Sequence, residues 1–146
     1  MKAPTAEQVS AIEGMGNRTF ERTDFTEGRV RAIDTIVLHG GGHPLSVHKD
    51  LCGGFEVDES DTAWHVGNWH CCMRSIAVEI GDGELCDDDI ERLRVIVTDL
   101  MDRYGIEADM VLRHFDVSGA MCPIRYVDPD AWRVLKEKIT TRTEAI

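Results

Sequence analysis

Two short apolar runs, each cut off abruptly by glycine, constrain the fold of this chain most. The first, IDTIVLH (33–39), is rich in β-branched residues and stops at GGGHP. The second, RSIAVEI (74–80), stops at GDG. Runs of this length that are apolar on both faces are typical of strands buried inside a sheet. The segment DMVLRH (109–114) predicts a third short strand, which ends in a histidine as the first one does.

Two helices are predicted between and after these strands. The segment CDDDIERLRVIVTDLMDRYGI (86–106) has Asp87 or Asp88 as a possible N-cap, an acidic first turn and Gly105 at the C-terminal cap. Its apolar side chains recur on one face, at Ile90, Leu93, Val97, Leu100, Met101 and Tyr104. The second helix begins with Asp128 as cap and Pro129 in its first turn. Strands that alternate with helices predict an α/β domain.

Length and composition are those of one globular domain. The chain has 146 residues, of which 42% are hydrophobic and 29% charged. The net charge of -11 disfavours nucleic acid as a partner, because phosphate backbones bind cationic surfaces. The N-terminal residues lack the apolar core of a secretory signal, and no stretch approaches the roughly 20 apolar residues of a membrane span. We therefore expect one domain over 1–146, made in the cytoplasm, with a short helix over 6–15 and residues 1–30 wrapping the rest.

The chain contains five cysteines, at positions 52, 71, 72, 86 and 122. An odd number in a reducing compartment argues against structural disulfides. His70, Cys71 and Cys72 lie together, but no C-x2-C pair is present, which favours core and loop cysteines over a second, structural metal site.

The segment RHFDVSGAMCP (113–123) holds a histidine and a cysteine, His114 and Cys122. His39 ends the first predicted strand, and ligands of open α/β sheets tend to bind where strands end. Two imidazole nitrogens and one thiolate suit zinc, with water as the fourth ligand. Cys122 as a nucleophile activated by His114, or as a buried apolar residue, remains open on this spacing alone.

Four blocks, in order, give the chain a resemblance to a known family. They are DTIVLHG, DTAWHVGNW, RSIAVEI and RHFDVSGAMCP, which together span about two-thirds of the chain. The sequence is similar to the zinc-dependent N-acetylmuramoyl-L-alanine amidases, which share a fold with phage lysozyme-type amidases and peptidoglycan recognition proteins. The resemblance implies a single α/β domain with a central mixed β-sheet flanked by helices.

The resemblance also implies roles for individual residues. His39, His114 and Cys122 match the ligands of one Zn²⁺, and Glu79 matches a general base. His65 is a candidate for catalysis and for substrate contact. The other residues expected to contact substrate are Trp64, Asn68 and Arg125, and Asp116 is expected to orient His114 or its loop.

One position departs from the family pattern. Many members have a lysine, or another polar residue, two positions before the last zinc ligand, where this chain has Ala120. Such a cation would stabilise the oxyanion of the tetrahedral intermediate. Arg113, Arg125 and His65 are the candidates to replace it.

The function that the resemblance implies is hydrolysis of the amide bond between N-acetylmuramic acid and L-alanine in peptidoglycan. We expect a monomeric phage or prophage endolysin that reaches the wall through a holin, contacts no membrane and carries no separate wall-binding domain. The alternatives are a non-catalytic peptidoglycan-binding module, a cytoplasmic amidase that recycles muropeptides, and a Cys-His hydrolase with Cys122 as nucleophile.

Overall fold

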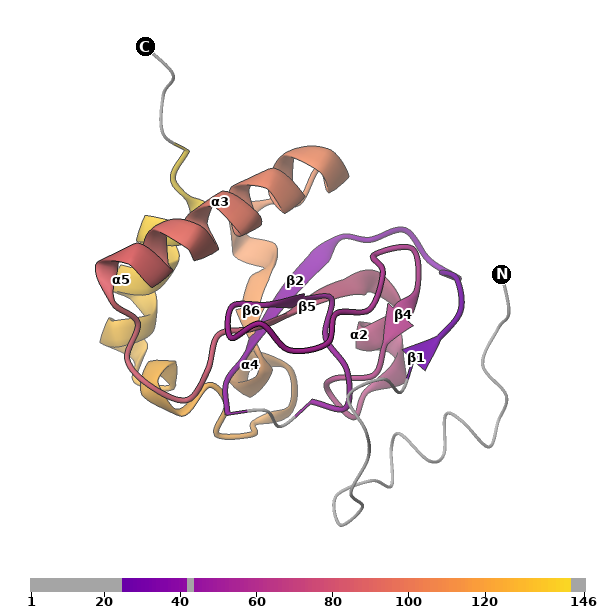
Figure 1. Cartoon of the computed structure of the whole chain (residues 1–146), viewed down its shortest axis with the longest axis horizontal. Helices are drawn as coiled ribbons and strands as arrows, with labels where there is room; N and C mark the ends of the chain where they lie inside the picture. The colour runs from indigo at the N-terminus through magenta and orange to yellow at the C-terminus, as the bar shows by residue number, and fades with distance from the viewer. Residues whose placement is uncertain (1–24, 42–43, 143–146) are drawn as a thin grey trace.

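The computed structural model describes residues 25–41 and 44–142, so the helix expected over 6–15 and most of the expected N-terminal wrap lie outside it. Its centre is a four-stranded sheet in the order β3-β5-β2-β6 (Figure 1). These strands are β3 (Lys49–Asp50), β5 (Ser75–Glu79), β2 (Thr35–His39) and β6 (Val111–Arg113). All of their pairings are parallel. An antiparallel pair, β1 (Phe25–Thr26) and β4 (Thr62–Ala63), forms a separate two-stranded sheet. The central sheet is therefore parallel and not mixed as expected, and the antiparallel pairing lies in the second sheet.

Both long predicted strands are confirmed: the first ends at His39 as predicted but begins two residues later, and the second is one residue shorter at each end. β2 and β5 are buried along their whole length and pair from Thr35↔Ser75 to His39↔Glu79. The third predicted strand is shorter than expected. Its first residues form a 3-10 turn, η2 (Ala108–Met110), and His114 begins a helix instead of ending the strand.

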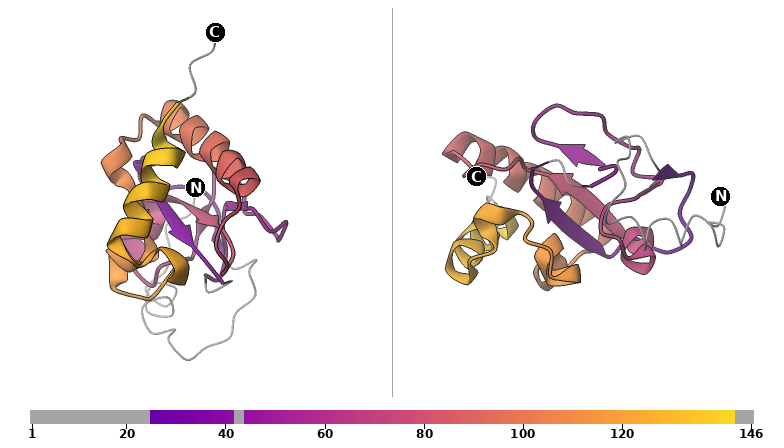
Figure 2. Two further views of the ribbon diagram at one scale, coloured as in Figure 1. Left: turned by 90° about the vertical axis from the view of Figure 1, so that its left-hand side faces the viewer. Right: turned by 90° about the horizontal axis from the view of Figure 1, so that it is seen from below.

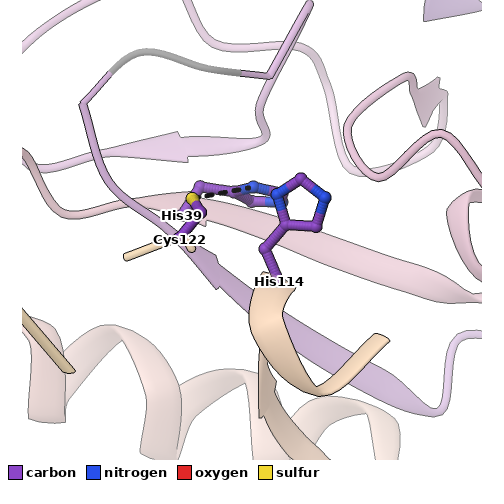
Figure 3. Close-up of side chains that lie close together, drawn as sticks. All are labelled: His39, His114 and Cys122. Carbon is purple, nitrogen blue, oxygen red and sulfur yellow. Dashed lines mark hydrogen bonds between the residues drawn. The ribbon is translucent and has the colours of Figure 1, made fainter. Parts of the chain in front are cut away.

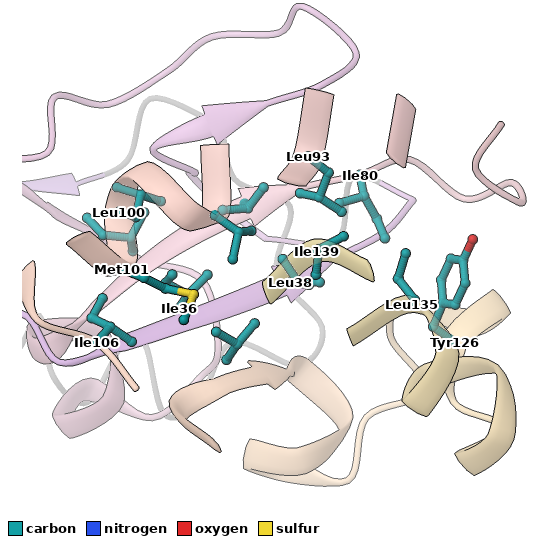
Figure 4. Packing of buried hydrophobic residues seen from close by; sticks show 14 of the residues in the cluster. Ile36, Leu38, Ile80, Leu93, Leu100, Met101, Ile106, Tyr126, Leu135 and Ile139 are labelled. Carbon is teal, nitrogen blue, oxygen red and sulfur yellow. The ribbon is translucent and has the colours of Figure 1, made fainter. Parts of the chain in front are cut away.

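The two faces of the sheet carry separate apolar clusters. Ile36 and Leu38 of β2 pack with the helices α3 (Asp87–Tyr104) and α5 (Pro129–Thr140) in the larger cluster, as Figure 4 shows. Val37 points to the opposite face, where it packs with the short helix α2 (Trp69–Arg74). Figures 1 and 2 show α3 and α5 next to each other at one side of the sheet and α2 at the other.

The predicted helix boundaries follow from capping chemistry, with one correction. Gly105 adopts the left-handed conformation (φ 66°) and donates its N–H to the Met101 carbonyl, which ends α3 as predicted. Asp128 caps α5 through a bond from the Ala131 N–H. The N-cap of α3, however, is Cys86 rather than Asp87 or Asp88. Both aspartates lie inside the first turn, where the helix dipole favours them without a capping bond.

Two further helical segments carry the end of the domain. α4 (His114–Ser118) follows β6 directly, and the 3-10 turn η3 (Ile124–Tyr126) precedes α5. No disulfide joins the five cysteines, all of which lie in the described part of the chain. Within residues 25–41 and 44–142, no helix has the length and apolar character needed to cross a membrane.

Candidate metal centre

The three expected ligands meet at the carboxyl ends of β2 and β6. His39 is the last residue of β2, His114 the first of α4, and Cys122 lies in the loop that follows α4. One donor atom from each lies within 4.8 Å of the others. Figure 3 shows the His114 ring facing His39 and Cys122. Within residues 25–41 and 44–142, this is the one group of three or more His, Cys, Asp or Glu residues arranged to hold a metal ion.

Hydrogen bonds to the backbone place Cys122 beside His114. The N–H of Phe115 donates to the Cys122 carbonyl at 2.9 Å, which closes the loop between the two ligands. Gly119, in the left-handed conformation (φ 79°), ends α4 and turns the chain back. The peptide bond from Cys122 to Pro123 is cis.

Arg113 anchors the segment that follows Cys122. Its Nη1 donates to the carbonyls of Tyr126 and Val127 at 2.8 and 2.9 Å. Its Nη2 donates to Asp116 Oδ1 at 2.7 Å, and the Arg113 side chain is only 9% exposed. One expectation is therefore wrong, because Arg113 is committed to structural contacts and does not replace the lysine missing at Ala120. Asp116 also holds the start of α4, since its Oδ2 accepts from the Arg113 N–H at 2.8 Å directly before His114.

The Cys122 sulfur lies in a buried setting shaped by Gly40. The N–H of Gly40 donates to Sγ at 3.2 Å, and Sγ lies 4.0 Å from Nδ1 of His39. Burial raises the pKa of the Cys122 thiol, and the Glu79 carboxylate raises it further, while the Gly40 bond acts in the opposite direction. A bound cation would reverse this, because metal coordination deprotonates a thiol.

Gly40 was missed by the sequence analysis, although the GGG that follows His39 is a signal for it. A Cβ at this position would lie 2.5 Å from the Gly81 carbonyl oxygen and 2.8 Å from Pro123 Cβ. Only glycine therefore allows the end of β2 to approach both the end of β5 and the segment that carries Cys122.

His39 is held from behind by a second histidine. Its Nε2 lies 2.7 Å from Nδ1 of His65, and the His65 Nε2 lies 2.7 Å from the Ser75 hydroxyl oxygen. His65 is 1% exposed. Burial, reinforced by the neighbouring His39, lowers the pKa of His65 well below its usual value, so its ring is neutral. The structure thus places His65 beneath a ligand and not on an exposed groove.

Glu79 lies beside His39 across the sheet. The two residues are register partners at the ends of β5 and β2, and Glu79 is 2% exposed. Its Oε2 accepts a bond from the Gly81 N–H at 2.8 Å, which fixes the carboxylate at the edge of the candidate site.

The expected substrate contacts occupy different settings. Trp64 is half-buried, its Nε1 donates to Thr26 Oγ1 at 3.0 Å, and its ring packs edge-on against Trp69. Asn68 is exposed and caps α2 through a bond from the Cys71 N–H. Arg125 is exposed in η3, three residues after Cys122.

The donor set fits a zinc ion. Two neutral imidazoles and one thiolate are borderline and soft ligands of the kind that zinc prefers, and three protein ligands leave a fourth position for water or substrate. One thiolate leaves a net positive charge on such a site. Fold and site together define a class of α/β domain with a candidate metal centre where its parallel strands end.

Comparison with known proteins shows which proteins this domain is similar to. The chain is 27% identical over 84 residues to the N-acetylmuramoyl-L-alanine amidase CwlL of Bacillus licheniformis. That match covers 49% of this chain but only 23% of CwlL. No protein-family model matches the chain.

Solved structures show the same architecture over most of the chain. The catalytic domain of XlyA matches with a TM-score of 0.63 at 19% identity, over 82% of this chain and 95% of that domain. The endolysin N-acetylmuramoyl-L-alanine amidase LysCS from Clostridium intestinale URNW matches with a TM-score of 0.59 at 17% identity, over 86% of this chain and 93% of LysCS. The chain therefore has the fold of these amidase domains, as the four sequence blocks implied.

Proposed function

We propose that this chain is a zinc-dependent N-acetylmuramoyl-L-alanine amidase, which hydrolyses the amide bond between N-acetylmuramic acid and L-alanine in peptidoglycan. The observation that carries the proposal is the meeting of His39, His114 and Cys122, with donor atoms within 4.8 Å, in a fold shared with amidase domains. The names of CwlL and LysCS supply the reaction.

The proposed site holds one Zn²⁺ per chain through His39, His114 and Cys122. When bound, zinc supplies a Lewis acid that polarises the amide carbonyl and makes water acidic enough to ionise near neutral pH. The protein contributes the geometry. β2 and α4 fix the two rings, and the Gly40 N–H holds the sulfur at 3.2 Å.

Glu79 is the proposed general base. Its carboxylate takes the proton of the attacking water as the new C–O bond forms, and returns it to the L-alanine nitrogen as the C–N bond breaks. The Gly81 N–H donates to Oε2 at 2.8 Å and so holds the carboxylate in place.

Contacts with the substrate are assigned to exposed and half-exposed residues around the centre. Asn68 and Arg125 are the exposed polar candidates, and the half-buried face of Trp64 offers an apolar surface to a sugar ring. Arg125 is also the remaining exposed cation proposed to compensate for Ala120. It follows Cys122 by three residues, whereas Arg113 is bound to Asp116 and to the backbone.

The proposed setting is a phage or prophage endolysin that acts as a monomer on the cell wall after holin-type release. The relation to LysCS, which is named an endolysin, supports this setting over that of a cytoplasmic muropeptide-recycling amidase. A search for activity should therefore begin with polymeric peptidoglycan and compare it with isolated muropeptides.

The test is a product assay on polymeric peptidoglycan and, in parallel, on purified muropeptides. We expect new L-alanine amino termini to appear, to stop when a chelator removes the metal, and to return when zinc is added. Bound zinc without release of amino termini would contradict the enzyme and favour a binding module. Activity that survives chelation but is abolished by a thiol alkylator would instead identify Cys122 as the nucleophile of a Cys-His hydrolase.

A further inference from the structure

The buried polar groups behind His39 form a row of hydrogen bonds in which each donor and acceptor can be assigned. We infer that Ser75 and His65 fix His39 in the tautomer that carries its proton on Nε2, so that Nδ1 is presented to the metal. The inference rests on the proposed function only in taking His39 as a ligand. His65 acts here as a positioning residue.

The direction of the chain is set at its far end by the Cys71 carbonyl. The Ser75 hydroxyl lies 2.6 Å from this oxygen, which can only accept a hydrogen bond, so the single hydroxyl proton of Ser75 is directed there. The Ser75 oxygen then has only acceptor capacity left for His65 Nε2, 2.7 Å away. His65 therefore carries its proton on Nε2.

The same reasoning passes through His65 to His39. A neutral imidazole with its proton on Nε2 has an acceptor lone pair on Nδ1. The Nδ1 of His65 lies 2.7 Å from Nε2 of His39, so the bond between them requires the proton on the His39 side. The Nδ1 of His39 then carries a lone pair, and this atom faces Cys122 Sγ at 4.0 Å.

Reversing the donors and acceptors of these hydrogen bonds would break one of them. If His39 carried its proton on Nδ1, His65 would have to donate from its own Nδ1, and Ser75 would have to donate to His65 in place of the Cys71 carbonyl. Ser75 and His65 are 0% and 1% exposed, so water does not readily replace a bond lost in this way.

The sheet explains why these residues meet. Ser75 and Glu79 begin and end β5 and point to the same face, because side chains two apart in a strand share a face. His39 points to this face from β2, where it pairs with Glu79. The His65 ring bridges Ser75 and His39. The backbone of His65 is fixed by its N–H, which donates to Cys72 Sγ at 3.5 Å.

The direct test is nuclear magnetic resonance of the metal-free protein with ¹⁵N-labelled histidine, which distinguishes the two neutral tautomers. We expect His39 with its proton on Nε2 in the wild type, and a mixture of tautomers in Ser75→Ala. Ser75→Thr, which keeps the hydroxyl, should restore the wild-type spectrum of His39. His48→Gln removes another histidine that is 1% exposed but takes no part in the hydrogen bonds from Ser75 through His65 to His39. This variant should leave the His39 tautomer unchanged.

Zinc affinity, measured by competition with a chelator, provides the second measurement. Ser75→Ala and His65→Phe should bind zinc about 10- to 100-fold more weakly than wild type, while His48→Gln and Ser75→Thr stay within about threefold. A wild-type His39 with its proton on Nδ1, or zinc affinity unchanged in both Ser75→Ala and His65→Phe, would overturn the inference. The wild type could instead show the expected His39 tautomer, lost in Ser75→Ala, and yet bind no zinc. That result would support the positioning of His39 by Ser75 and His65 and contradict the proposed function.

Discussion

His39 and Glu79 pair in register as the last residues of the adjacent parallel strands β2 and β5. Both are buried, at 0% and 2% exposed, and both side chains belong to the face that carries His65 and Ser75. Because side chains alternate along a strand, a shift of β5 by one residue would move the carboxylate to the opposite face. The sheet register therefore places the proposed base next to a proposed ligand.

Replacing the Glu79 carboxylate with an amide should separate catalysis from metal binding. Glu79→Gln keeps the size of the side chain but cannot take up a proton, so muropeptide cleavage should fall about 10²- to 10⁴-fold while zinc stoichiometry is unchanged. Glu84→Gln, at an exposed position, serves as the control. Cleavage by Glu79→Gln at the wild-type rate would remove Glu79 from the mechanism.

Gly40→Ala should disturb the junction between β2, β5 and the Cys122 segment. The added Cβ would meet the Gly81 carbonyl oxygen at 2.5 Å and Pro123 Cβ at 2.8 Å. We expect a loss of about 1–3 kcal/mol in the free energy of unfolding, measured with urea, together with weaker zinc binding. The control is Gly83→Ala, where no heavy atom lies within 4 Å of the added Cβ. Equal stability of the two variants would show that the junction is not tight.

Arg113→Lys should loosen the segment that carries Cys122 without touching a ligand. Lysine cannot reproduce the guanidinium bonds to the Tyr126 and Val127 carbonyls and to Asp116. We expect a loss of about 1–3 kcal/mol in the free energy of unfolding and a lower zinc affinity, with the His39 tautomer unchanged. The exposed Arg133→Lys is the matched control. Wild-type stability in Arg113→Lys would contradict the anchoring role.

The buried His48 predicts how stability depends on pH. Burial, with a further contribution from Arg29, lowers the pKa of His48 from 6.5 to about 3. Between these two values the unfolded chain binds a proton that the folded chain does not. His48 therefore lowers the free energy of unfolding as the pH falls below about 6.5, by up to about 1.4 kcal/mol per pH unit.

Urea unfolding of the wild type and of His48→Gln, between about pH 7 and about pH 5, checks this slope. The variant lacks the titrating ring, so its stability should fall less steeply with acidification, whatever its stability at neutral pH. Parallel slopes for the two proteins would show that the ring accepts a proton in the folded state.

Local patterns predicted the elements but not the contacts between them. The apolar runs predicted β2 and β5. The capping residues predicted that α3 ends at Gly105 and that α5 begins after Asp128. The position of His39 at a predicted strand end made it a candidate ligand. The resemblance then favoured Cys122 as a ligand over its other interpretations and added Glu79 as the general base. His114 was identified, although it begins α4 instead of ending a strand.

The parts of the site that the sequence did not reveal depend on contacts between distant residues. His65 was expected on a groove, but it lies behind His39, which is 26 positions away. The Gly40 N–H donates to Cys122 Sγ, 82 positions away in the sequence. The Arg113 guanidinium donates to the Tyr126 and Val127 carbonyls, which follow the Cys122 loop. Hydrogen bonds of this kind leave no periodic pattern in a single sequence, because they are set by how the elements pack.

The most direct test is zinc stoichiometry, measured together with muropeptide cleavage, in wild type, Cys122→Ser and Cys86→Ser. Cys86 is exposed at the start of α3, makes no capping bond with its side chain and is not among the proposed ligands, so it allows the same substitution away from the site. We predict one zinc per chain in wild type and in Cys86→Ser, with release of L-alanine amino termini by both, and loss of zinc and activity together in Cys122→Ser. Full zinc content and activity in Cys122→Ser would contradict the proposed metal centre.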